Sequence, residues 1–172
     1  MKKTIVYILL SLSAIFLICG CSNKQNIRVK EKDGQTYLTI PDALNNTFSL
    51  SKPLISSGFE ETDDALTFVI SNDKYKTFID TLKDKINTNI ANANESSNYP
   101  SVSEIKIDDA MEKLEVSILP SAYEDSDDDV IIKALSTQII IYKIYTGEKA
   151  QLEIKYYDAE SKSVYDTEKI SY

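Results

Sequence analysis

Several residue types are missing or scarce in this chain of 172 residues. It contains no histidine, no tryptophan, two cysteines and four glycines. The absence of histidine excludes a Ser-His-Asp triad, a Cys-His pair and a histidine-ligated zinc site. The few glycines form no glycine-rich phosphate-binding loop, and no G-x-S-x-G motif is present. We therefore expect no catalytic residues, no metal site and no cofactor.

Basic residues are also in deficit. Lysine and arginine number 19 against 27 aspartates and glutamates, which gives a formal net charge of −8 at pH 7. Nucleic-acid binding depends on clustered Lys and Arg side chains that neutralise phosphates. We therefore expect no nucleic-acid partner.

The N-terminal region has the layout of a secretory signal peptide. A basic stub, residues 1–3, precedes an apolar run over residues 4–17 and a short segment that ends at Cys21. A membrane-spanning helix needs about 20 apolar residues, and this run of 14 is shorter. We therefore expect residues 1–20 to be a cleaved signal peptide and not an uncleaved anchor helix.

The segment Ile18-Cys19-Gly20-Cys21 resembles the lipobox of bacterial lipoproteins, in which an aliphatic residue, a small residue and Gly or Ala precede the modified cysteine. Cys19 is an uncommon occupant of its position, but it is small and apolar. The resemblance implies that Cys21 receives a diacylglyceryl group and that cleavage follows Gly20. Fatty chains such as palmitate then anchor the chain to the extracytoplasmic face of the cell membrane, and two or more chains hold a domain stably.

Lipidation changes the chemistry that remains in the mature chain. Removal of residues 1–20 takes away two lysines and no acid, so the net charge becomes −10. Cys19 leaves with the signal and Cys21 is acylated, so no thiol remains for a disulfide, for catalysis or for a metal. Residues 21–26 are predicted to be a lipidated tether, about 15 Å long as a random coil. Residues 27–172 are predicted to form a single α+β extracytoplasmic domain.

The apolar pattern predicts an antiparallel sheet of about five to seven strands with two helices packed on one face. The dipeptide Asp33-Gly34 predicts a type I′ turn between two strands. Apolar residues at spacings of three and four predict an amphipathic helix of about 20 residues, capped by Ser71 or Asn72 and followed by a loop over residues 92–100. Residues 41–61 have no assignable pattern. The strands expected lie within residues 27–40 (a hairpin), 65–70, 104–107, 113–118, and 151–157 with 163–170 (a last hairpin).

A second helix is predicted to open at Ser126 and to run through Tyr145, with Gly147 as its stop. Ser126 and Asp129 have the spacing of a capping box. The stretch of residues 139–145 is rich in β-branched side chains, so a strand is the alternative there.

Two short segments of the chain are similar in sequence. Residues 104–110 and 153–159 agree at five of seven positions, and each segment follows a predicted helix and opens a predicted hairpin. A duplicated helix-plus-hairpin unit and chance similarity are both open interpretations.

An acidic run over residues 124–129 is a candidate calcium site. An EF-hand loop that began at Asp125 would need Gly at its sixth position and Glu at its twelfth, where the chain has Val130 and Ser136. The motif therefore fails, and the run is better explained as a helix start whose acids favour the positive end of the dipole. Calcium binding without a motif is the alternative.

Tyrosine is the abundant aromatic residue, with 11 copies against five phenylalanines. Tyrosine suits strands because its ring packs while its hydroxyl reaches solvent, and exposed tyrosines also serve as partner contacts. The residues that we predict as a contact surface are Tyr156, Tyr157, Tyr165 and Tyr172.

These observations predict a membrane-anchored, non-enzymatic lipoprotein of the cell envelope that binds a partner protein or envelope component through its sheet face or C-terminal hairpin. One alternative is a small envelope hydrolase, which needs two carboxylates about 5 to 10 Å apart across a cleft. Another is a solute-capturing lipoprotein, which needs a large apolar cavity. A deep pocket would favour either alternative, whereas a flat polar sheet face would favour the binding module.

Overall fold

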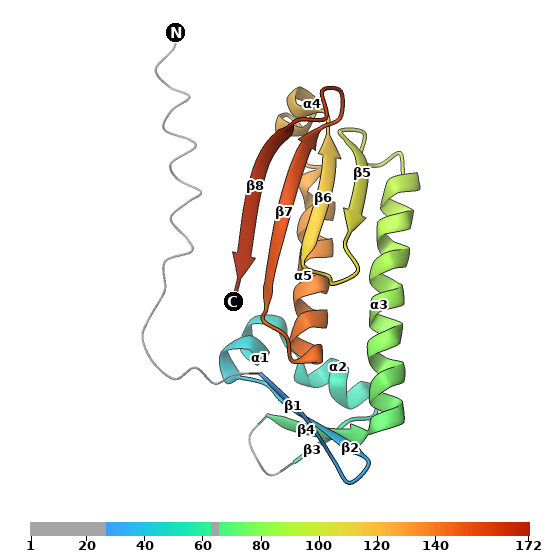
Figure 1. Ribbon diagram of the computed structural model, residues 1–172, viewed down its shortest axis with the longest axis vertical. Coiled ribbons are helices and arrows are strands. Elements are labelled where there is room, and N and C mark those ends of the chain that lie inside the picture. The colour runs from blue at the N-terminus through green and yellow to red at the C-terminus, as the bar shows by residue number, and fades with distance from the viewer. Residues whose placement is uncertain (1–26, 63–65) are drawn as a thin grey trace.

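The computed structural model describes residues 27–62 and 66–172, so the predicted signal peptide, the tether and Cys21 lie outside the described residues. The described chain is α+β and contains two four-stranded sheets and five helices (Figure 1). None of these helices has both the length and the apolar composition that crossing a membrane requires. The elements are β1 (Arg28–Lys32), β2 (Gln35–Thr39), α1 (Asp42–Phe48), α2 (Ser51–Ser56), β3 (Glu60–Glu61), β4 (Thr67–Ser71), α3 (Asn72–Glu95), β5 (Val102–Ile107), β6 (Lys113–Ile118), α4 (Pro120–Glu124), α5 (Asp129–Thr146), β7 (Gln151–Asp158) and β8 (Val164–Ser171).

The first sheet, sheet A, has the strand order β1-β2-β4-β3 and is antiparallel throughout. Asp33 (φ 52°) and Gly34 (φ 77°) connect β1 to β2, and two consecutive positive φ angles are what a type I′ turn requires. The predicted hairpin is therefore confirmed. Leu38 and Phe68 are fully buried on one face of the sheet, so sheet A presents that face to the core.

Residues 41–61, which have no assignable sequence pattern, fold as α1, α2 and β3. The two helices are seven and six residues long, too short to display the periodicity that identifies a helix in a sequence. Ser49 ends α1 with a left-handed backbone (φ 54°). Leu50 and Leu54 then enter the core, where they are 1% and 0% exposed. Burial of these side chains, more than local propensity, therefore explains why this segment is ordered.

Sheet B contains the other four strands in the order β5-β6-β7-β8, close to the predicted strand positions. The predicted count of about five to seven strands is too low, since the structure describes eight. The prediction of a single antiparallel sheet is also wrong in two respects. The strands divide between two sheets, and β6 and β7 pair in parallel. A parallel pair needs a crossover connection, which α4 and α5 supply between these two strands.

Two long helices, α3 and α5, pack against each other and against one face of sheet B (Figure 1). Helix α3 has 24 residues, with Ser71 as its N-cap, so the loop predicted from residue 92 begins at Ser96 instead. It also contacts β2 and β4 and therefore lies against both sheets. The prediction of two helices is wrong in number, because the structure also describes α1, α2 and α4. The two helices expected from the sequence correspond to α3 and α5, which lie on one face of sheet B.

Helix α5 begins at Asp129, later than the predicted start at Ser126, and Asp128 is its N-cap. The Ser126 hydroxyl accepts the backbone N–H of Asp128 (3.2 Å) and donates to a carbonyl of the preceding turn. The predicted capping box is therefore wrong. Residues 139–145 are helical, which excludes the strand alternative, and Gly147 (φ 78°) ends the helix as predicted.

The two helix-plus-hairpin units, α3-β5-β6 and α5-β7-β8, have opposite hands. Both helices cover the same face of sheet B (Figure 1), and both hairpins progress in the same lateral direction across the sheet. Since β6 is antiparallel to β5 and parallel to β7, the first strands of the two units run in opposite directions. No rotation superimposes such units. The sequence similarity of residues 104–110 and 153–159 therefore does not reflect two copies of one fold.

A continuous apolar core joins the two sheets. Tyr145 of α5 is 1% exposed, its hydroxyl donates to the carbonyl of Leu50 (3.2 Å), and its own carbonyl accepts the Tyr75 hydroxyl (2.9 Å). Its ring lies 5.3 Å from that of Phe78, which packs edge-on against Phe59 at 5.2 Å. The end of α5 is thereby attached to α2 and α3, which fixes sheet A relative to sheet B.

Candidate functional site

The face of sheet B opposite the helices carries polar and charged side chains, and we term it the open face. Strand register places Lys106, Glu115 and Lys155 side by side across β5, β6 and β7. The next row continues the alternation of charge across β6, β7 and β8. The open face consists of Glu104, Lys106, Lys113, Glu115, Ser117, Glu153, Lys155, Tyr157, Thr167 and Lys169.

The charges of the open face pair with one another along β5, β6 and β7. The ion pairs are Lys106 with Glu104 (2.8 Å), Lys155 with Glu153 (3.3 Å) and Lys113 with Glu115. The hydrogen bond between Lys113 and Glu115 raises the pKa of the lysine and lowers the pKa of the glutamate. Exposed pairs of this kind stabilise a fold by about 0 to 1 kcal/mol. The charge pattern therefore contributes little to the stability of the fold. Its main effect is on which charged surfaces can approach the open face.

Two hollows lie along the open face. The smaller, about 150 Å³, includes Tyr157 and Lys162. The larger, about 490 Å³, lies where β6 and β7 begin and β8 ends. Both have charged linings, unlike the large apolar cavity that solute capture requires. The larger hollow is lined by Asp108, Glu112, Lys113, Gln151, Leu152, Glu153, Lys169, Ile170 and Ser171.

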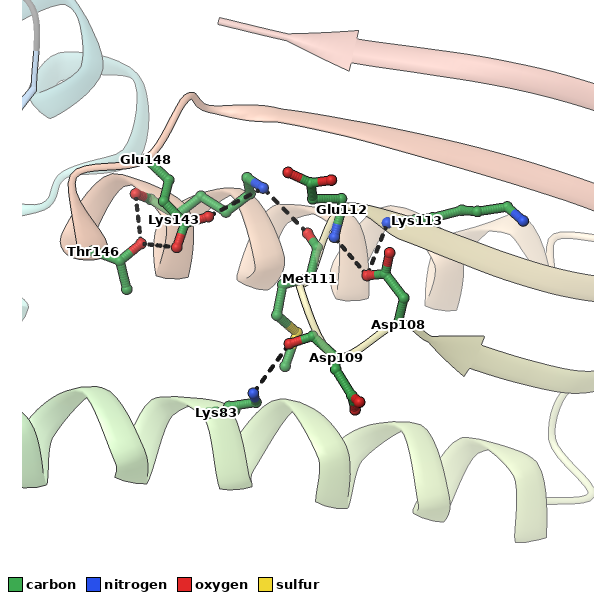
Figure 2. Close-up of polar contacts among 9 residues, drawn as sticks. All are labelled: Lys83, Asp108, Asp109, Met111, Glu112, Lys113, Lys143, Thr146 and Glu148. Carbon is green, nitrogen blue, oxygen red and sulfur yellow. Dashed lines mark hydrogen bonds and ion pairs between the residues drawn. The ribbon is translucent and has the colours of Figure 1, made fainter.

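The β5–β6 turn forms one wall of the larger hollow, and a buried lysine contacts this turn (Figure 2). Lys143 of α5 is 2% exposed, and its Nζ lies 3.5 Å from the carbonyl oxygen of Met111 and 3.3 Å from Oε2 of Glu148. Met111 is buried and has a positive φ of 55°, which is uncommon for a residue other than glycine. The lysine therefore contacts the turn at the residue whose backbone has the uncommon positive φ.

The same turn is fixed at two further points. The Asp108 carboxylate accepts the backbone N–H groups of Glu112 (2.7 Å) and Lys113 (3.2 Å). Lys83 of α3 donates to the carbonyl of Asp109 (3.2 Å), so each long helix contributes one lysine to the turn (Figure 2). Because Asp108 bonds the backbone of its own turn, we assign it a positioning role for that wall.

Two carboxyl groups of this sheet have shifted pKa values, and both shifts are downward. The hydrogen bond from Lys113 lowers the pKa of Glu115, and a hydrogen bond from the backbone N–H of Glu160 is the main cause that lowers the pKa of Asp158. A general acid needs a raised pKa near the working pH. Neither group therefore has the property that the hydrolase alternative requires.

Two of the four predicted contact tyrosines lie on opposite faces of β7. Tyr157 is on the open face, where its hydroxyl lies 3.5 Å from Oε1 of Glu115. Tyr156 points toward the helices, its ring is 5.9 Å from that of Tyr123, and burial raises its pKa. Only Tyr157 is therefore available on the open face.

The other two tyrosines lie at the two ends of β8. Tyr165 is 43% exposed and its hydroxyl donates to the carboxylate of Glu124. Tyr172 is 55% exposed and packs edge-on against Phe48 of α1 at 5.0 Å. The structure therefore does not bring the four tyrosines together into one surface.

The acidic run at residues 124–129 is used for internal contacts. Asp128 is 8% exposed, and its carboxylate accepts the N–H (2.9 Å) and the hydroxyl (2.5 Å) of Ser101. Asp129 pairs with Lys133 one turn along α5. Over residues 27–62 and 66–172, no three acidic or cysteine side chains are grouped so that they could hold a metal ion. The calcium alternative therefore lacks a ligand set in this run.

Sequence reasoning missed Lys143, although a signal was present. Lys143 follows Ile139 by four positions and Ile140 by three, which places it on the apolar stripe of α5. A lysine on such a stripe is a candidate buried charge. Cys21, the predicted lipidation site, lies outside the described residues.

Comparison of the chain with protein-family models, with curated proteins and with solved structures finds no significant match.

Proposed function

We propose that this protein is a lipoprotein anchored through Cys21 to the extracytoplasmic face of the cell membrane, where it acts as a non-catalytic binding module for a protein or another envelope component. The lipobox supports the anchor. The observation that carries the binding role is the open face of sheet B, a four-stranded surface with charges that alternate in register.

The size of the open face indicates the kind of contact it makes. Four strands at about 4.8 Å spacing and six to eight residues at about 3.3 Å per residue cover roughly 20 Å by 20 Å. This is about half of the 800 Å² or so that each partner contributes to a stable interface. We therefore propose a transient contact that uses the open face, or a larger one that also includes the loops around the two hollows.

The charge pattern indicates the chemistry of the partner. Lysine and glutamate alternate on the open face, so a surface of one sign meets repulsion from half of the charges, whereas a complementary mixed surface does not. The partner is therefore proposed to be a protein with alternating charges, and the contact is proposed to weaken as the salt concentration rises.

The anchor is tested by mass spectrometry of the mature N-terminal peptide. A diacylglyceryl group on Cys21 with residues 1–20 removed is the expected result, and Cys21→Ala is expected to leave the precursor uncut. A bare or unprocessed N-terminus in the parent protein would contradict the anchor.

The binding role is tested by crosslinking in membranes followed by recovery of the protein. The double substitution Lys106→Glu and Lys155→Glu makes one row of the open face wholly acidic, and we expect it to abolish the crosslinked product. Lys85→Glu with Lys133→Glu changes the net charge equally at exposed positions of α3 and α5 and is expected to retain the product. Equal behaviour of the two variants would exclude the open face.

A further inference from the structure

A row of three cationic side chains lies on the outer face of sheet A. Arg28, Lys30 and Lys32 occupy alternate positions of β1, all three are exposed, and alternate residues of a strand project to one face. Their register partners across β2 are polar or partly exposed, whereas the residues between those partners are buried. The three cations, which we term the basic row, therefore lie on the face of sheet A that does not contact the core.

The basic row contrasts with the charge of the whole protein. The chain without residues 1–20 has a net charge of −10, and an acidic protein is repelled by an anionic surface. Glu60 of β3 pairs with Val69, which pairs with Tyr37 of β2, the partner of Lys30. Strand register therefore places one acid, Glu60, on the outer face of sheet A. Lys32 also pairs with Asp33 of the turn, at 3.8 Å. Among the described residues, this face therefore carries an excess of positive charge.

The strand that carries the basic row is held firmly in the fold. Val29 lies so close to the end of α5 that a Cβ added at Gly147 would be 2.8 Å from Val29 Cγ2. Strand β1 also pairs with β2 along all five of its residues. The basic row is therefore pre-organised and keeps its orientation relative to the rest of the protein.

The basic row is close in sequence to the proposed lipid anchor. Arg28 lies seven positions after Cys21, and a chain of that length spans at most about 25 Å. Electrostatic attraction in physiological salt acts over a Debye length of about 8 Å. An anchored protein therefore keeps this face within reach of the headgroup layer, and small movements bring it into range.

We propose that the outer face of sheet A docks on the anionic phospholipid headgroups of the membrane that holds the anchor. This inference rests on the proposed lipid anchor at Cys21. Sheet A lies at one end of the long axis, and α4 with the β7–β8 turn lies at the other (Figure 1). Docking at sheet A directs that far end away from the bilayer, so the open face of sheet B extends into the envelope space.

The test uses the full-length lipidated protein in vesicles. With Cys21 acylated, Gln35→Cys places a single fluorescent label on the outer face of sheet A, and Ala134→Cys places the control label on α5. Vesicles of phosphatidylcholine alone are compared with vesicles that contain about one-third phosphatidylglycerol, both with a headgroup quencher. We expect stronger quenching of the label at residue 35 in the anionic vesicles, lost in about 1 M salt, and no such difference for the label at residue 134.

Substitution of the basic row supplies the matched comparison. A basic residue at an anionic surface favours docking by about fivefold, so Lys30→Glu with Lys32→Glu is expected to reduce the ratio of docked to undocked protein by at least about tenfold. Lys85→Glu with Lys133→Glu is expected to keep it. Each double variant breaks one exposed ion pair, which makes their structural effects comparable.

The outcomes separate docking from anchoring. Vesicles that float with the protein but quench the label at residue 35 equally in both lipid compositions would overturn docking and leave the anchor intact. Equal loss of quenching in the two double variants, or protection of the label by a soluble polyanion but not by anionic vesicles, would also overturn docking. Protein that fails to float with either vesicle would overturn the anchor and the docking that rests on it.

Discussion

Replacement of Lys143 by methionine removes the buried charge but keeps a long apolar side chain. It therefore separates the free-energy cost of burying the ammonium from the free energy gained by burying the methylenes. The ammonium group lies in a side chain that is 2% exposed, with the Glu148 carboxylate at 3.3 Å. Removing an ammonium from water costs several kcal/mol even after the protein relaxes. Attraction to a carboxylate about 4 Å away stabilises the pair by about 4 kcal/mol at an effective dielectric constant of about 20, and by about 1 kcal/mol in bulk water.

The exposure of Glu148 decides the balance. Its side chain is 45% exposed, so the pair lies between the two dielectric limits and the attraction about cancels the desolvation cost. Lys143→Met keeps a long apolar stem, and we expect it to change the free energy of unfolding by less than about 1 kcal/mol.

Two companion substitutions are expected to destabilise the fold for different reasons. Lys143→Ala removes three buried methylenes at about 0.8 kcal/mol each and leaves a cavity, so we expect a loss of about 2 to 4 kcal/mol. Glu148→Gln removes the negative charge beside the buried ammonium and leaves it neutral carbonyl oxygens as partners. Breaking a fully buried pair costs about 3 to 5 kcal/mol, and the exposure of Glu148 reduces the expected loss to about 1 to 3 kcal/mol.

Equilibrium unfolding in urea, followed by far-ultraviolet circular dichroism, measures all three variants. An unchanged denaturant slope shows that each change acts on stability and not on the denatured state. Lys133→Met on the exposed side of α5, where the lysine is 74% exposed, is the control and is expected to stay within about 0.5 kcal/mol. If Lys143→Met is as destabilising as Lys143→Ala, or if Glu148→Gln has no effect, attraction to Glu148 does not offset the desolvation cost of the Lys143 charge.

Three further predictions concern the junction of the two sheets. Tyr145→Phe removes one of two donors to the Leu50 carbonyl, which also accepts the Leu54 N–H (3.3 Å). It is expected to lower the unfolding free energy by about 0.5 to 1.5 kcal/mol in thermal melts, and unchanged stability would exclude the tyrosine bond. Gly147→Ala meets both a positive φ of 78° and Val29, so a loss of about 2 kcal/mol or more is expected in urea, and a neutral result would contradict the close approach. Burial raises the pKa of Tyr75 to about 12 and also raises the pKa of Tyr145, so the folded state favours the neutral phenols. The free energy of unfolding that these two groups contribute is present below pH 10 and is lost as the pH rises from about 10 toward 12. Tyrosinate absorbance recorded with circular dichroism checks this, and simultaneous ionisation of all tyrosines near pH 10 in an intact fold would disprove it.

Much of the local structure could be predicted because its causes lie within a few residues. Asp33 and Gly34 tolerate positive φ, so their turn was identifiable before any partner strand was known. Gly147 likewise marked the end of α5. The alternation of buried and exposed side chains over residues 113–118 was correct at every position of β6.

The arrangement of these elements could not be predicted in the same way. Alternation in β6 reports which side chains are buried, but an antiparallel and a parallel neighbour both satisfy it. The direction of β7 depends on where α5 packs, and that depends on α3. The candidate site follows the same rule: the alternating charges of Lys106, Glu115 and Lys155 become one row only after strand register is set.

Residue chemistry and short-range pattern were sufficient to establish the charge of the chain, the absence of histidine and most helix and strand positions, and they predict a lipobox at Cys21. Contacts between distant residues were required for the rest. Lys143 reaches a turn 32 residues away, and the Tyr145 hydroxyl bonds a carbonyl 95 residues away. The division into two sheets, the burial of Lys143 and the separation of the tyrosines all depend on such contacts, because the free energy of burial is determined by which surfaces meet and not by their order along the chain.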